Sequence, residues 1–208
     1  MPNWTSNTLK APAEVLKKYI RKDEDGSDVF DFNLVITIPE LYNDPELTEG
    51  FDTEWCIYWY KSKKGTDDSV NPLNYESNVA KMLKYCLERS AEYYRRGKKY
   101  AEAFEKYGHR TWGGWCVDNW GTKWNACDSD CSHVDEGLVT FNTAWCMPDP
   151  IINKIMFDNH DCEISITWRD EDYDGTRTFW HDGHGGYHNE TEWEDEYAYH
   201  DEDEDAER

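Results

Sequence analysis

The amino-acid sequence predicts an α+β fold: a largely antiparallel sheet with helices on one face, a long inserted helix and an acidic C-terminal tail. Segments in which apolar and polar residues alternate are interspersed with segments of helical spacing, and this mixed order favours that architecture. The 208 residues are enough for a domain with a real hydrophobic core. The formal net charge is -22, but 15% of the residues are aromatic, and disordered acidic chains are poor in aromatics. The chain is therefore expected to fold.

The N-terminal part predicts extended segments around one short helix. Residues 4–10 are expected as a strand, and apolar residues at helical spacing make residues 12–20 a helix. Residues 30–39 are expected to be extended and to end at Pro39. Alternation over residues 55–60 favours a further short strand.

A long amphipathic helix from about residue 77 to residue 107 is the strongest periodic signal. Its centre holds the only dense basic cluster of the sequence, residues 95–99, in which Gly97 weakens the helix and favours a kink. A solvated helix face is the favoured interpretation of this cluster. The alternative is a contact with an acidic partner or with the acidic tail.

Residues 112–125 hold four tryptophans among glycines and turn-forming residues, which predicts a tightly packed hairpin or strand edge. Clustered indoles usually belong to a core, so loss of the Trp120 and Trp124 rings is expected to unfold the protein. The alternative is an aromatic pocket for a nucleotide or a cation.

The C-terminal part predicts three strands and one helix. A polar loop over residues 127–137 precedes a strand at 138–145, and a proline marks the first turn of a helix at 148–157. Residues 163–168 and 176–180 are expected to pair as a hairpin across an acidic turn.

These elements divide the chain into an α+β domain, residues 1–188, with a helical insertion at about 42–108, and an acidic disordered tail, residues 189–208. The tail has eleven carboxylates and one arginine, which gives it a formal charge of -10 and leaves -12 on the other residues. The body is therefore acidic even without its tail.

Seven cysteines that follow no signal segment indicate reduced thiols in the cytoplasm, and no apolar stretch approaches the ~20 residues that cross a bilayer. Two clusters have the chemistry of metal ligands. They are Cys127, Cys131 and His133 in one case, and His181, His184 and His188 in the other. The Cys127 cluster offers one pair of closely spaced ligands, whereas a structural zinc site usually has two such pairs. The His181 cluster lies in a glycine-rich connector to the tail. We therefore expect neither a metal nor another cofactor.

Four motifs, together with their spacing along the chain, resemble those of a known family. They are Met1-Pro2-Asn3-Trp4-Thr5-Ser6-Asn7, Phe30-Asp31-Phe32-Asn33 with Ile38-Pro39-Glu40, Asn119-Trp120-Gly121-Thr122-Lys123-Trp124-Asn125, and Phe141-Asn142-Thr143-Ala144-Trp145. Together they resemble an uncharacterised phage and plasmid family described as having a YubB ferredoxin-like domain. The resemblance covers the opening strand and about residues 112–180. It implies a ferredoxin-like sheet and an accessory gene of a mobile element, and it supplies no catalytic residues. Thr5 stands where family members often have cysteine, which argues against shared thiol chemistry there.

The sequence contains no phosphate-binding loop, nucleophile elbow or His-Glu-x-x-His helix, so a non-enzymatic protein is expected. Carboxylates on its acidic surface can imitate the phosphates of a nucleic-acid duplex. The acidity therefore favours a protein that blocks a host defence or DNA-processing complex. The expected partner is a host protein with a cationic nucleic-acid-binding site, because the negative charge opposes direct binding to nucleic acid or to an anionic membrane. The simpler alternative is that acidity only supports solubility.

The carboxylates expected to bind this partner lie on the last hairpin and behind it. They are Asp170, Glu171, Asp172, Asp174, Glu192, Glu194, Asp195 and Glu196. A hypothesis of another class is a ligand-binding module that sequesters a nucleotide signal or a metal through the tryptophans and the two His/Cys clusters.

Overall fold

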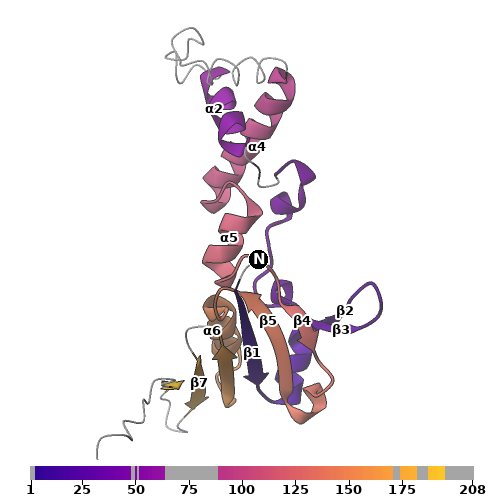
Figure 1. Ribbon diagram of the computed structural model, residues 1–208, viewed down its shortest axis with the longest axis vertical. Coiled ribbons are helices and arrows are strands. Elements are labelled where there is room, and N and C mark those ends of the chain that lie inside the picture. Colours follow the sequence, from indigo (N-terminus) through magenta and orange to yellow (C-terminus); the bar gives the residue numbers. More distant parts are fainter. Residues whose placement is uncertain are drawn as a thin grey trace, which may run out of the picture. The chain divides into compact units, whose positions relative to one another are not determined.

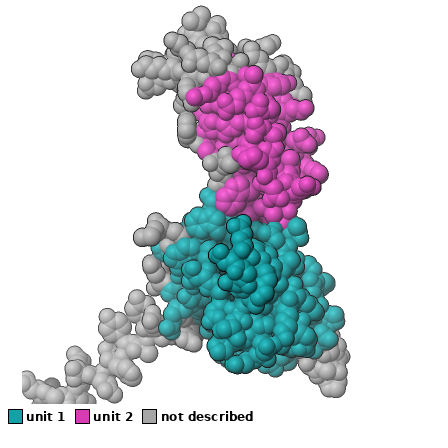
Figure 2. All heavy atoms as spheres, turned by 90° about the vertical axis from the view of Figure 1, so that its right-hand side faces the viewer, with its two compact units in different colours: residues 1–37, 120–208 teal, residues 38–119 magenta. Residues whose placement is uncertain are grey.

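The computed structural model describes residues 3–47, 50, 52–63, 89–170, 174–181 and 187–194. The chain divides into two compact units (Figure 2). Unit 1 comprises residues 1–37 and 120–208, and unit 2 comprises residues 38–119. The insertion expected at about 42–108 falls within unit 2.

Unit 1 is built on a six-stranded sheet in which every neighbouring pair is antiparallel (Figure 1). The strands are β1 (Trp4–Lys10), β4 (Cys127–Asp130), β5 (Leu138–Ala144), β6 (Ile164–Arg169), β7 (Asp174–His181) and β8 (Tyr187–Glu194). Their order in the sheet is β4-β5-β1-β6-β7-β8. The predicted α+β class is confirmed, as are the strands expected from the alternation at 4–10, 138–145, 163–168 and 176–180.

Strand β1 lies in the middle of this sheet and pairs with β5 on one side and β6 on the other. Its side chains alternate between the two faces, so Thr5, Asn7 and Leu9 are buried while Ser6 is exposed. Because β5 and β6 follow the same alternation, a slip of one residue would expose the core face of the strand. The sheet therefore has one packed face and one open face.

Two helical segments pack on the buried face. Helix α1 (Ala13–Leu16), continued by a 3-10 turn at Lys17–Tyr19, buries Val15 and Leu16. Helix α6 (Asp149–Asp158) buries Ile151, Ile152, Ile155 and Met156, which follow the helical spacing read from the sequence. Asn159 joins the two segments, because its amide donates to the Tyr19 hydroxyl at 3.0 Å.

An aromatic cluster fills the core beside β5. A small second sheet, β2 (Ile20–Lys22) and β3 (Asp28–Phe30), delivers Phe30 to within 5.0 Å of Phe141, measured between ring centroids. The chain then turns into a 3-10 helix at Phe32–Leu34, so the continuous extended segment expected over residues 30–39 is wrong at these residues. Asp31 begins this turn by accepting a hydrogen bond from the Asn33 amide at 2.9 Å, an N-cap that a period-2 pattern does not reveal.

Unit 2 is built from helices, one of which stands where the sequence predicted a strand. Helix α2 (Thr53–Lys63) replaces the strand expected at residues 55–60. Nearly every residue of that segment is aromatic or apolar, which satisfies both periods, and the buried side chains Thr53, Cys56 and Ile57 have helical spacing. Helix α4 (Ser90–Tyr107) confirms the part of the long amphipathic helix that lies within the described residues.

The tryptophan segment predicted as a hairpin is a helix, α5 (Trp112–Trp120). The buried side chains Trp115, Cys116 and Trp120 lie one, four and five positions apart on one side of it. Glycines at 113 and 114 suggested a turn, but close packing of the bulky indoles overrides their low helix propensity. The helical spacing of Trp112, Trp115 and Cys116 was the signal in the sequence that could have identified this helix.

The C-terminal boundary also differs from the expectation. Strand β8 extends as far as Glu194, so residues 189–194 of the segment expected as a tail belong to the sheet. Residues 195–208 lie outside the described part of the chain.

Gly97 is a packing residue of unit 2. Helix α4 runs through it without a break, and a Cβ atom there would stand 2.0 Å from the Cys56 carbonyl oxygen of α2. We expect Gly97→Ala to lower the free energy of unfolding by about 1–3 kcal/mol, because overpacking outweighs alanine's better helix propensity. Chemical denaturation measures this change. The exposed Glu105→Ala in the same helix is the control, and stabilisation by Gly97→Ala would contradict the close approach of the two helices.

The polar pair Thr5 and Thr143 lies in register inside the core. The Thr143 hydroxyl donates to the Cys146 carbonyl at 2.7 Å and accepts from the Asn7 amide at 2.8 Å, whereas the buried Thr5 hydroxyl has no hydrogen-bond partner among the described residues. Thr5→Val should therefore raise the free energy of unfolding by about 1 kcal/mol, and Thr143→Val should lower it by at least as much. Equal effects of the two substitutions in thermal unfolding would refute this assignment.

Candidate functional site at one end of the sheet

Half of the carboxylates predicted to bind a partner belong to the described residues. Asp170 follows β6, Asp174 begins β7, and Glu192 and Glu194 lie near the end of β8. Glu171, Asp172, Asp195 and Glu196 lie outside the described part of the chain. The hairpin register places Asp174 directly opposite Glu194, and Glu192 opposite Thr176. The structure thus brings the described members together at one end of the sheet.

The same end of the sheet holds polar residues from the central strands. Ser6 of β1 pairs in register with Asn142 of β5 and with Arg169 of β6, and Arg169 pairs in turn with Asp174 of β7. The Ser6 hydroxyl donates to Asn142 at 3.1 Å, and the Asn142 amide donates to Asp128 at 3.3 Å. One cross-strand row therefore connects β5 to the acidic hairpin.

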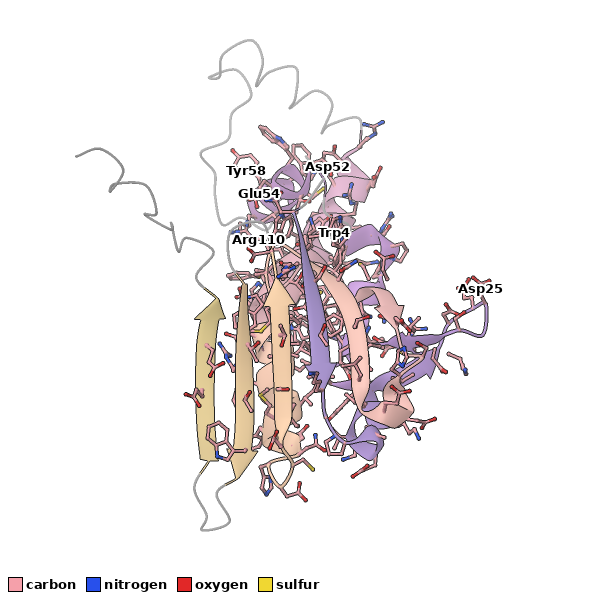
Figure 3. The ribbon with its side chains drawn as sticks, turned by 60° about the horizontal axis from the view of Figure 1, so that its bottom comes forward. Trp4, Asp25, Asp52, Glu54, Tyr58 and Arg110 are labelled. Carbon is pink, nitrogen blue, oxygen red and sulfur yellow. The ribbon has the colours of Figure 1, made fainter. Side chains whose placement is uncertain are left out.

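Next to this row stand three tryptophans at the surface, which we call the tryptophan row: Trp4, Trp124 and Trp145. The ring centroids of Trp4 and Trp124 are 6.1 Å apart, and Trp124 stacks on Trp145 at 5.9 Å with 25° between the ring planes. Trp4, labelled in Figure 3, is 40% exposed, and Trp145 is 50% exposed. Of the four tryptophans expected to form a core, Trp115 and Trp120 are buried, whereas Trp112 and Trp124 are partly exposed.

Backbone geometry holds the tryptophan row in place. Trp145 has φ 72° and Asp128 has φ 49°, and these are the positive-φ residues other than glycine in the part of the chain that the structure describes. A bulky residue in the left-handed region is strained, and such strain persists where surrounding contacts over-determine the backbone. Those contacts are the hydrogen bond from the Trp145 amide to the Asn3 carbonyl at 2.9 Å and the one from the Thr122 hydroxyl to the Ala144 carbonyl at 3.1 Å.

A buried carboxylate anchors the loop that carries Trp124. Asn125 donates to Asp31 at 2.6 Å and accepts from the Phe32 amide at 2.8 Å. Burial pushes the pKa of Asp31 upward, but hydrogen bonds from Asn125, from the Asn33 amide and from Arg21 outweigh it and leave the pKa below its ordinary value. The charged form of Asp31 is therefore the one that holds the loop.

The basic cluster of residues 95–99 is paired within unit 2. Arg96 donates to the Asp52 carboxylate at 2.7 and 3.1 Å, and both side chains are largely buried. Arg95 and Lys99 bind Glu46, and their hydrogen bonds lower the pKa of Glu46 to about 2. Arg95 and Lys98 are exposed, so part of the cluster lies on the solvated helix face that the sequence favoured, while Arg95, Arg96 and Lys99 also form ion pairs with neighbouring carboxylates. The alternative contact with the tail would involve residues 195–208, which lie outside the described part of the chain.

A separate hollow of about 590 Å³ lies beside α6 and the far end of β7. Its lining residues are Asn153, Met156, Phe157, Asp158, His160, Cys162, Phe179 and Trp180. It has the size of a small-molecule pocket and is predominantly apolar. It lies at the opposite end of β7 from Asp174, so it is distinct from the end of the sheet that carries the tryptophan row.

The first of the two predicted metal clusters is described and its side chains have other partners. The Cys127 thiol donates to the Asn125 carbonyl at 3.4 Å, and His133 contacts Glu136 at 3.1 Å. Burial raises the pKa of the Cys127 and Cys131 thiols, which disfavours the thiolates that bind zinc. Among the described residues no three His, Cys, Asp or Glu side chains converge on a metal position. His184 lies outside the described residues.

Comparison of the chain with protein-family models, with curated proteins and with solved structures found no match. No helix among the described residues has both the length and the apolar character needed to cross a membrane. The candidate site therefore rests on its own geometry.

The Asp31 anchor predicts an acid-dependent release of the Trp124 loop. Because the pKa of Asp31 is lowered in the folded protein, its stabilising effect is present above the ordinary carboxyl value and is lost as the pH falls through the lowered one. We expect Asp31→Asn to lower the melting temperature at pH 7 and to lose less stability than wild type between pH 4 and pH 2. Parallel pH profiles of the two proteins in thermal unfolding would contradict this role.

Proposed function

We propose that the protein is a non-enzymatic accessory protein of a phage or plasmid that acts in the host cytoplasm. It occupies the cationic nucleic-acid-binding site of a host defence or DNA-processing complex by presenting carboxylates in place of phosphates. It binds a host protein in this role, and neither nucleic acid nor a membrane directly. The net charge of -22 and the acidic end of the sheet support this proposal.

The observation that most strongly supports this proposal is the spacing of the glutamates on β8. Positions 190, 192 and 194 alternate along one strand, and Glu190 and Glu192 are exposed. An antiparallel strand rises about 3.4 Å per residue, so alternate positions repeat about every 6.8 Å. Phosphates along one strand of duplex DNA advance about 3.4 Å each along the helix axis, so the axial advance of two phosphates equals this repeat. Rigid strand geometry thus gives the carboxylates a spacing that suits a phosphate-binding site.

The pairing of Asp174 with Glu194 adds a second argument. Like charges at directly opposed positions of an antiparallel pair destabilise the sheet. A solubilising surface has no need for this arrangement, since scattered charges serve that purpose equally well. Local rules of stability are broken most often at functional sites.

The topology of unit 1 is consistent with the resemblance to the YubB ferredoxin-like family. In chain order β1, α1, β4, β5, α6 and β6 follow the β-α-β-β-α-β pattern, and their sheet order is β6-β1-β5-β4. We assign a ferredoxin-like topology to these elements, extended at the β6 edge by the β7–β8 hairpin. The resemblance then supports the assignment to a mobile element.

Charge reversal on β8 tests the proposed function. We expect Glu192→Lys with Glu194→Lys to abolish capture of the host complex from a nuclease-treated bacterial lysate, because the cationic site then meets like charge. The matched control is Glu24→Lys with Asp25→Lys in the turn between β2 and β3, where Asp25 is labelled in Figure 3. It makes the same change in net charge and should leave capture intact.

Mass spectrometry of the retained proteins identifies the partner in this experiment. Capture that survives the β8 substitutions would overturn the proposal. Equal loss with both pairs of substitutions would show that net charge alone matters and would equally remove the role of the β7–β8 hairpin.

A further inference from the structure

We infer that the tryptophan row is the anchor of the partner interface, and that it stacks against arginine side chains of the cationic site. This inference rests on the proposed function and adds to it the residues and the chemistry that would make the contact specific. Trp4, Trp124 and Trp145 are the binding residues, and guanidinium groups of a protein partner are their ligands.

The exposure of the row separates it from a core. Indoles are on average highly buried, whereas Trp4 and Trp145 remain 40% and 50% exposed although two other tryptophans of the chain, Trp115 and Trp120, are almost fully covered. The rings are adjacent: Trp4 is tilted by 34° against Trp124, and Trp124 stacks on Trp145 with 25° between the ring planes. Because Trp124 contacts both of the exposed rings, the three indoles form one contiguous aromatic patch.

The row is also pre-organised. Trp145 keeps a left-handed backbone at φ 72°, and the next residue is tied on both sides, because the Cys146 carbonyl accepts from Thr143 at 2.7 Å and its thiol donates to the Gly121 carbonyl at 3.1 Å. Asn125 ties down the other end of the Trp124 loop. An interface whose aromatic side chains are already ordered loses less entropy on binding, and tryptophan is enriched among the residues that dominate binding energy.

Charge complementarity identifies the ligand. Asp128, Asp170, Asp174 and Glu194 belong to the same end of the sheet, against the basic residues Lys123 and Arg169. A phosphate group would meet this negative excess, and the chain as a whole carries -22. A cation is favoured, and tryptophan is the best aromatic partner for cations.

Arginine suits the tryptophan row and its neighbouring carboxylates better than lysine does. A guanidinium group is planar, so it lies flat on an indole while its N–H groups point outward to carboxylates, and it is more weakly hydrated than an ammonium group. Lysine interacts with the acidic residues as a point charge and gains little from ring planes. Arginine is also the residue that recognises phosphates in nucleic-acid-binding sites, so a mimic of phosphates meets arginine there.

Two labelled peptides of equal charge, nine arginines and nine lysines, test the inference with the full-length protein. We expect fluorescence anisotropy to give a dissociation constant about tenfold lower for the arginine peptide. Trp4→Thr with Trp145→Gly should remove this preference and leave the affinity for the lysine peptide unchanged. Threonine suits a strand, and glycine suits the left-handed backbone, so the variant should fold, as circular dichroism would verify.

Three controls make the outcomes distinct. Phe157→Ala removes another exposed aromatic side chain, 77% exposed on α6, and should keep the preference for arginine. Glu192→Lys with Glu194→Lys should weaken the binding of both peptides to the same extent. This variant tests the proposed function separately from the tryptophan row. Adenosine monophosphate is the probe for a nucleobase as the occupant.

The inference is overturned if wild type binds both peptides equally, or if the tryptophan variant keeps the preference for arginine. Binding of adenosine monophosphate that depends on Trp4 and Trp145, without a preference for arginine, would also overturn it and would assign the row to a nucleobase. A loss of the preference in the tryptophan variant alone, with capture of the host complex still sensitive to charge reversal on β8, supports both proposals independently.

Discussion

The pairing of β1 with neighbours on both sides is the constraint on which unit 1 depends. Its seven residues pair with β5 and five of them also pair with β6, so the direction and register of the central sheet follow from one strand. Because side chains alternate along it, Thr5, Asn7 and Leu9 enter the core and Trp4 and Ser6 reach the open face. The tryptophan row and the buried polar pair are two consequences of the same register.

The end of the sheet combines features that stability alone does not favour. A tryptophan in a left-handed conformation, exposed stacked indoles and directly opposed acidic residues all lie within one region of unit 1. Each feature carries a small free-energy penalty, and aromatic packing around Phe30, Phe32, Phe141 and Trp120 stabilises the fold against them. Violations of local stability rules are expected at functional sites, which is why this region is the candidate site.

The carboxylates of the two units have different roles. In unit 2 the carboxylates of Asp44, Glu46 and Asp52 form ion pairs with the basic residues of α4. These ion pairs hold the segment that precedes α2 against helix α4. In unit 1 Glu190 and Glu192 of β8 are exposed to solvent. The excess of carboxylates in the composition thus has separate structural and exposed components, and a count of charges cannot distinguish them.

Periodicity in the sequence determined the α+β class, the strands β1, β5, β6 and β7 and helix α6, because in each of them a single period matches one buried face. It failed for α2 and α5, where dense aromatic residues satisfy two periods, and packing decided between them. Acidic residues of the candidate site were predicted by composition. The tryptophan row was not, because Trp4 and Trp145 are far apart in the sequence, and only the β1–β5 register, Trp4 opposite Ala144, brings them together.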